Sequence, residues 1–68
     1  MKEFVKRMLV EYEELDERTT KLLNFLLSDT YKNTLDDENR ELLTLQYHAM
    51  VIYRDVLKKR IDIQEKDE

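Results

Sequence analysis

The sequence predicts an all-α fold, an antiparallel hairpin of two long helices whose connector holds a short helical turn. Three observations support this prediction. The 68 residues include no Gly and no Pro, so no turn that depends on either residue is available. Asp, Glu, Lys and Arg make up 41% of the chain, and Leu, a strong helix former, is abundant. Apolar residues recur at alternating spacings of three and four, with one polar interruption.

We expect a single domain over residues 1–63. It consists of a helix over about residues 3–27, a connector over 28–36 and a second helix over about 37–63, followed by a charged tail over 64–68 that frays. A core of this size rarely supplies more than roughly 3–5 kcal/mol of net stability, so a domain this small needs a partner.

The first helix has a heptad seam, an apolar stripe with alternating three- and four-residue steps. Thr19 fills its one polar step, where its hydroxyl either bonds the carbonyl four residues earlier or contacts a ligand. The apolar residues of the helix span an arc of roughly 140°, which one partner helix nearly covers. The seam consists of Val5, Met8, Tyr12, Leu15, Thr19, Leu22 and Leu26.

The connector is predicted from the run "SDTYKNTLDDEN", whose Ser, Asp, Thr and Asn side chains compete for backbone groups. Ser28 is expected to cap a short helical turn, and Asp36 to cap the second long helix. Leu35 is expected to be a buried plug at the bend, with Tyr31 beside it.

The second helix carries more apolar surface than one partner can cover. Its apolar residues spread over an arc of roughly 220°, against about 100° for a helix that faces one core. We therefore expect the hairpins to assemble into a homo-oligomeric helical bundle. The predicted interface consists of Leu42, Leu43, Leu45, Ala49, Met50, Ile52, Val56, Leu57 and Ile61.

The composition argues against several classes of function, among them metal binding, catalysis and binding of duplex nucleic acid. Without Cys there are no disulfides or thiolate metal sites, His48 stands alone, and the acidic run over 11–17 is read as a solvated face. We expect no metal, no cofactor and no enzymatic activity. The net charge of −4 argues against a duplex nucleic-acid binder. Since no run is apolar enough to cross a membrane, we expect a soluble, unprocessed chain.

Several polar residues support both a structural and a binding interpretation. Gln46 either sets the register of an oligomer core or reads the edge of a ligand. Arg18 and Lys21 either pair with the carboxylates four residues earlier or hold a phosphate. Arg54 and Arg60 lie near Tyr53, where they either pack at the rim of the core or clamp a phosphate while the ring stacks on a base.

The chain resembles a group of small phage-encoded helical-hairpin proteins, the family named after a crAss-like phage protein. Two patterns carry the resemblance, "EL..R..KL..FL.S..F" and "LL..Q...M..Y...L..RI", and it covers about residues 4–61. One departure is Tyr31, where the pattern has Phe. The matching positions are Glu14, Leu15, Arg18, Lys21, Leu22, Phe25, Leu26, Ser28 and Tyr31, then Leu42, Leu43, Gln46, Met50, Tyr53, Leu57, Arg60 and Ile61.

That group is similar to the hairpin domain of phage sponge proteins that defeat CBASS and Thoeris immunity. The resemblance implies a homo-oligomer that holds a nucleotide signal between its copies by aromatic stacking and cationic contacts. No individual sponge residue aligns here. The candidates that this sequence offers for such a site are Tyr53, Arg54, Arg60, Gln46, Arg18, Lys21 and Tyr12.

Two functions are compatible with these observations. The first is a phage anti-defence protein in the cytoplasm of the infected bacterium, which sequesters a cyclic oligonucleotide or an ADP-ribose-type signal without cleaving it. The alternative is a non-enzymatic interaction module that docks a host or phage protein through its apolar helix face.

Overall fold

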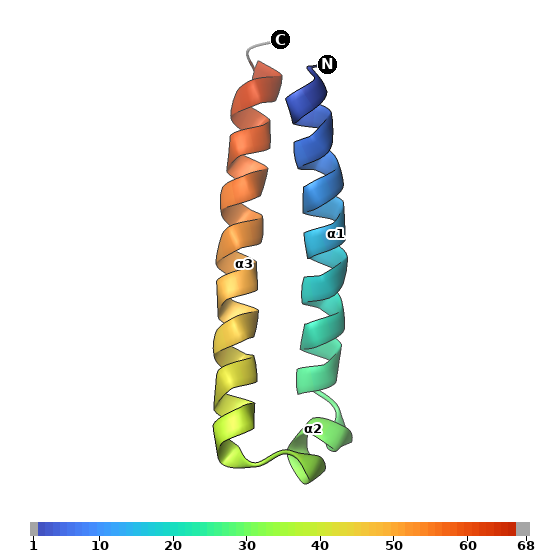
Figure 1. Cartoon of the computed structure of the whole chain (residues 1–68), viewed down its shortest axis with the longest axis vertical. Helices are drawn as coiled ribbons and strands as arrows, with labels where there is room; N and C mark the ends of the chain where they lie inside the picture. The colour runs from blue at the N-terminus through green and yellow to red at the C-terminus, as the bar shows by residue number, and fades with distance from the viewer. Residues whose placement is uncertain (1, 67–68) are drawn as a thin grey trace.

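The computed structural model describes residues 2–66 as three helices, α1 (Glu3–Leu26), α2 (Asp29–Thr34) and α3 (Asp37–Lys66). α1 and α3 run antiparallel along their whole length, and α2 lies at the end opposite both termini (Figure 1). The described residues form no strand. The predicted all-helical class and the pairing of the two long helices are therefore confirmed.

The hairpin is long and thin. It measures 49 × 15 × 14 Å, and its radius of gyration is 15.4 Å. A compact domain of 68 residues would have a radius of gyration of about 11 Å. A single pair of helices therefore leaves much of its side-chain surface facing water.

The helix boundaries follow the capping residues of the connector. Ser28 Oγ accepts a hydrogen bond from the Tyr31 amide at 3.2 Å, and Asp36 Oδ1 accepts one from the Asn39 amide at 2.9 Å. Both predicted caps are confirmed. In residues 2–66 no φ is positive, so the bend is made by extended backbone at Ser28 and Leu35 rather than by left-handed residues.

Two details of the connector and the tail differ from the expectation. Leu35 is half-buried, because a hairpin with no third layer has nothing to cover its outer side. α3 continues through 64–66, three residues past the predicted end, and the rest of the expected frayed tail, 67–68, lies outside the described residues.

The core lies in the half of the hairpin near the termini. Met8, Leu57 and Ile61 form a buried cluster, with Val5 and Leu15 also buried on α1. Thr19 is buried in the same seam, and its hydroxyl donates to the Leu15 carbonyl at 2.7 Å, the first of the two predicted alternatives. The alternating three- and four-residue spacing places all of these α1 side chains toward α3.

Leu57 and Ile61 belong to the predicted oligomer interface, but in the single chain each is only 1% exposed. They lie inside the hairpin because the helical repeat brings both onto the stripe of α3 that faces α1. The other predicted interface residues keep surface in the single chain. Leu43 and Met50 are half-buried, and those that are exposed are Leu42, Leu45, Ala49, Ile52 and Val56.

Candidate functional site

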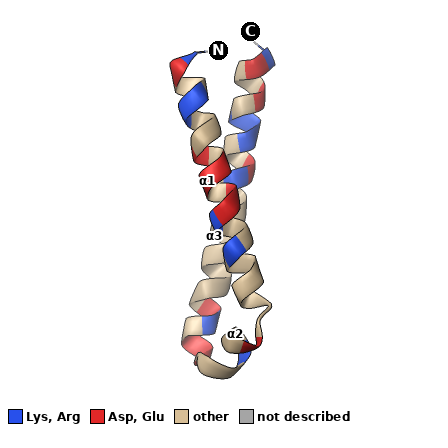
Figure 2. Cartoon of the chain, turned by 90° about the vertical axis from the view of Figure 1, so that its right-hand side faces the viewer, with Lys and Arg blue, Asp and Glu red and all other residues tan. Residues whose placement is uncertain are grey.

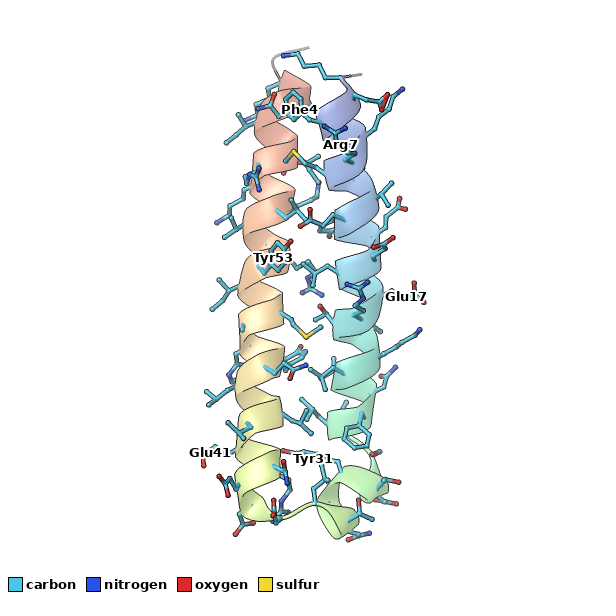
Figure 3. The ribbon with its side chains drawn as sticks, viewed as in Figure 1. Phe4, Arg7, Glu17, Tyr31, Glu41 and Tyr53 are labelled. Atoms are coloured by element: carbon cyan, nitrogen blue, oxygen red, sulfur yellow. The ribbon has the colours of Figure 1, made fainter. Side chains whose placement is uncertain are left out.

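Three of the predicted binding residues form one row along α3. Gln46, Tyr53 and Arg60 follow one another at intervals of seven residues, so the helical repeat aligns them. All three are exposed, and the Tyr53 side chain is 48% exposed. Figure 3 shows Tyr53 near the middle of α3. We call these residues the Gln46 row, which offers an amide, an aromatic ring and a guanidinium on one line.

Arg54 is engaged elsewhere. Its Nη1 lies 3.2 Å from Asp16 Oδ1 on α1, and its Nε lies 3.8 Å from Asp55 Oδ1. The Arg54 side chain is only 25% exposed. This guanidinium therefore links the two long helices, and a ligand would have to displace a carboxylate to reach it.

The cations of α1 form ordinary surface pairs. Arg18 Nη2 lies 3.7 Å from Glu14 Oε2, and Lys21 Nζ lies 3.1 Å from Glu17 Oε1. Both pairs have the predicted four-residue spacing. All four side chains are more than half exposed, so water screens the pairs and either cation can turn toward a ligand at small cost.

Tyr12 has a structural position. Its ring is half-buried and packs against the cluster of Met8, Leu57 and Ile61. The structure therefore separates the seven predicted binding residues into an exposed row on α3, a screened pair on α1, an interhelical ion pair and a ring at the edge of the core.

A shallow, open depression of about 440 Å³ lies at the connector end of the hairpin. None of its lining residues is among the predicted binding residues. α2 contributes one aromatic ring, and α3 contributes the remaining side chains from successive turns. The lining consists of Tyr31, Arg40, Glu41, Thr44, Leu45 and His48.

The Tyr31 hydroxyl organises this depression. It donates to the Arg40 carbonyl at 2.9 Å and lies 3.1 Å from Thr44 Oγ1. Its ring meets the Phe25 ring edge-on, with centroids 5.9 Å apart. Tyr31 thus joins the ends of all three helices, and the hydroxyl that distinguishes it from the Phe of the resembling pattern makes both polar contacts.

The cation of the depression is held in place by the connector. Arg40 Nη2 pairs with the Asp37 carboxylate, and Nη1 donates to the Lys32 carbonyl at 3.4 Å. His48 is exposed one helical turn past Thr44, with its ring 5.9 Å from that of Tyr47. Guanidinium, imidazole, phenol and hydroxyl groups around an apolar floor can bind a flat ligand that carries an anionic group. Such an anion would compete with the Asp37 carboxylate for Arg40 and would lie near the Glu41 carboxylate.

Sequence reasoning treated His48 as a solvated surface residue, and its exposure agrees with that reading. The grouping of His48 with other residues that line the depression was not predicted. Arg40, Thr44 and His48 follow at intervals of four, which places them on one face of a helix, and this signal was present in the sequence. The approach of Tyr31 from α2 depends on the bend and could not be read from spacing.

Charge is distributed unevenly along the hairpin (Figure 2). Acidic residues gather in the middle of α1, and uncharged residues dominate between there and the connector. Near the end of α3, Lys58 Nζ donates to Asp62 Oδ1 at 2.8 Å, and this hydrogen bond raises the pKa of Lys58.

Residues 2–66 form neither a metal-binding cluster nor a membrane-spanning helix. These residues include no group of three or more His, Cys, Asp or Glu placed to hold a metal ion. No helix among them is both long and apolar enough to cross a membrane.

The chain was also compared with known proteins. The family model described as Sequestin matches residues 2–63. No curated protein and no solved structure matches the chain.

Proposed function

Because the chain belongs to the Sequestin family, we propose that it captures and sequesters a nucleotide second messenger of bacterial immunity. The family match carries this proposal, since the family's name denotes sequestration and the match covers nearly the whole hairpin. In this proposal the protein is phage-encoded and acts in the cytoplasm of the infected host. The resemblance to the crAss-like-phage group and to the sponge proteins supports the same function.

The Gln46 row supplies the chemistry that such capture needs. The Tyr53 ring can stack on a base, an interaction worth roughly 1–3 kcal/mol per base. Arg60 is exposed and has no ion-pair partner within the described residues, so its guanidinium can pair with a phosphate. The Gln46 amide can both donate to and accept from a base edge.

Arg18 and Lys21 can add to the attraction for an anion, because their own ion pairs are screened by water. Capture by stacking and ion pairing needs neither a nucleophile nor a metal. The proposal therefore includes no bond cleavage, and the messenger is removed from its receptor by binding alone.

We further propose that the binding unit is a homo-oligomer. A 68-residue hairpin has a small core, and α3 exposes large apolar side chains along most of its length. Association of identical chains would cover that surface and would place the Gln46 row beside a neighbouring copy.

The exposed apolar residues of α3 also favour a second candidate. Leu42, Leu45 and Ile52 are each more than half exposed and form a stripe of the kind that docks into a hydrophobic groove. In this alternative the partner is a host or phage protein, and the chain acts as an inhibitor or adaptor.

Calorimetry separates the two candidates. Protein whose mass has been measured by light scattering is titrated with cyclic dinucleotides, cyclic trinucleotides and ADP-ribose derivatives. We expect heat with at least one class, and recovery of that nucleotide intact after the protein is denatured. Absence of heat with every class, on a folded oligomer, would favour the protein partner, and a cleaved nucleotide would contradict sequestration.

Variants then test the site. Tyr53→Ala and Arg60→Ala should each weaken binding at least tenfold while the oligomer mass stays unchanged. Lys6→Ala is the control for loss of a cation, since Lys6 is exposed on α1. If Lys6→Ala weakens binding as much as Arg60→Ala, the effect is one of net charge. If Tyr53→Ala or Arg60→Ala dissociates the oligomer, the loss of binding reports loss of assembly and not loss of a ligand contact.

A further inference from the structure

α3 carries two apolar series with alternating three- and four-residue steps, and α1 covers only one of them. The covered series ends in Leu57 and Ile61, which are buried. The second series is exposed, and its large side chains keep between 50% and 64% of their surface. We call it the outer seam, and it consists of Leu42, Leu45, Ala49, Ile52, Val56 and Ile63.

The outer seam has the regularity of a coiled-coil interface. Its steps are three, four, three and four from Leu42 to Val56, followed by seven to Ile63, so it extends over about three heptads. The omitted step is Lys59, an exposed residue between Val56 and Ile63. In a parallel pair it faces Lys59 of the second copy, and both long side chains must extend past the apolar residues to reach water.

Two different rows border the outer seam. On one side lies the Gln46 row, each residue four positions after a seam residue. The other side carries four residues that each come one position before a seam residue. Figure 3 shows the first of them, Glu41, on the outer side of α3. We call this second set the Glu41 row, and it consists of Glu41, His48, Asp55 and Asp62.

These rows discriminate between the two ways in which a second copy could lie on the seam. If two α3 helices ran antiparallel, each row would face its own kind, so that Glu41 would meet Asp55 of the second copy and the carboxylates would repel. If they ran parallel, each row would face the other, and Asp55 would meet Arg60 of the second copy. Opposite charges would then meet twice in a symmetric dimer.

We infer that two copies of this chain pair in parallel along their outer seams, and that each copy completes the depression at the other's connector end. Leu45 belongs to both the seam and the depression, so a helix on the seam lies along the depression's edge. In the parallel register Glu41 faces Gln46 of the second copy, and His48 faces Tyr53 of the second copy.

The completed pocket takes groups from two chains. One copy supplies Tyr31, Arg40 and His48 around the apolar floor, and the second copy supplies the Gln46 amide and the Tyr53 ring. A nucleobase would stack on that ring while its phosphate meets the guanidinium and the imidazole. The assignment of a nucleotide to this pocket rests on the proposed function, whereas the parallel pairing does not.

Engineered cysteines test the pairing, since the natural chain has no Cys. In a parallel pair, Ile52→Cys and Leu42→Cys should each form a disulfide-linked homodimer alone, because each position faces its own copy. In the antiparallel pair that sets Glu41 opposite Asp55, position 42 faces position 52, so linkage would require a mixture of the two variants. Val10→Cys, an exposed apolar position on α1, is the control and should not link.

The cross-linking result decides the pairing without any ligand. Linkage of the two single variants alone supports parallel pairing. Parallel pairing is overturned if linkage occurs only in the mixture. It is also overturned if linkage is absent or no greater than that of Val10→Cys. A chain that binds no nucleotide can still pass this test, so failure of the proposed function is separable from failure of the pairing.

Complementation tests the composite pocket with the cyclic di- and trinucleotides of the calorimetric panel. Tyr53→Ala and His48→Ala should each lose binding alone. Refolded together in equal amounts, they should recover roughly a quarter of the sites, because half the dimers are mixed and each mixed dimer has one intact pocket. If both single variants lose binding and the mixture recovers none, the two residues act within one chain and the composite pocket is refuted.

Discussion

Truncation of Leu57 is the sharpest test of how the hairpin is held together. Its side chain is 1% exposed and packs with Met8 and Ile61 in the buried cluster. Leu→Ala substitutions in a well-packed core cost about 2–5 kcal/mol. A core of this size rarely supplies more than roughly 3–5 kcal/mol of net stability. Leu57→Ala should therefore leave the chain largely unfolded near room temperature.

Leu42→Ala is the matched control, because it removes the same atoms from the same helix. Leu42 is 57% exposed in the single chain. Exposed positions change stability by about 0.5 kcal/mol or less, so in dilute protein this variant should unfold almost like the parent. Far-UV circular dichroism during urea unfolding gives both free energies, and light scattering at the same concentrations gives the mass.

Concentration adds a second comparison. The loss of unfolding free energy in Leu57→Ala should persist at every protein concentration. In Leu42→Ala the loss should grow with concentration as the parent protein associates, because mass action links folding to assembly. Suppose both variants lose the same unfolding free energy in samples that light scattering shows to be monomeric. That result would refute the assignment of the core to the stripe around Leu57 and Ile61.

Three further predictions follow from individual contacts. Tyr31→Phe removes two hydrogen bonds of the hydroxyl and should cost about 0.5–1.5 kcal/mol, seen as a Tm several degrees lower; an unchanged Tm would contradict the bracing role. A double-mutant cycle with Arg54→Met and Asp16→Asn should give a coupling of about 0.2–1 kcal/mol, since Asp16 is half exposed, and a coupling of zero would mean that the pair is not populated. Asp62→Asn should return the pKa of Lys58 toward its ordinary value in an NMR titration, and an unchanged pKa would exclude the hydrogen bond as the cause.

The sequence alone determined the helices of this protein and the breaks between them. Alternating three- and four-residue spacing identifies α1 and its seam, and the Ser28 and Asp36 side chains locate the breaks, because capping is decided by neighbours within one turn. The bond from Thr19 to the Leu15 carbonyl was predictable for the same reason. Each of these features depends only on residues a few positions apart.

Tertiary structure decided which of the two apolar series of α3 meets α1. An apolar arc of roughly 220° allows α3 to be rotated about its axis in several ways, and spacing along one helix cannot choose among them. The choice depends on contacts summed across both helices. In the observed rotation of α3, Leu57 and Ile61 are buried against α1 and Arg54 pairs with Asp16. The outer seam faces water.

The depression at the connector is likewise a tertiary feature. The sequence places Arg40, Thr44 and His48 on one face of α3, but it does not place Tyr31 against them. That contact requires the bend to return α2 onto α3, where the Tyr31 hydroxyl reaches the Arg40 carbonyl. Side-chain direction within a helix is a local property of the chain, whereas the meeting of two helices depends on the path of the whole backbone between them.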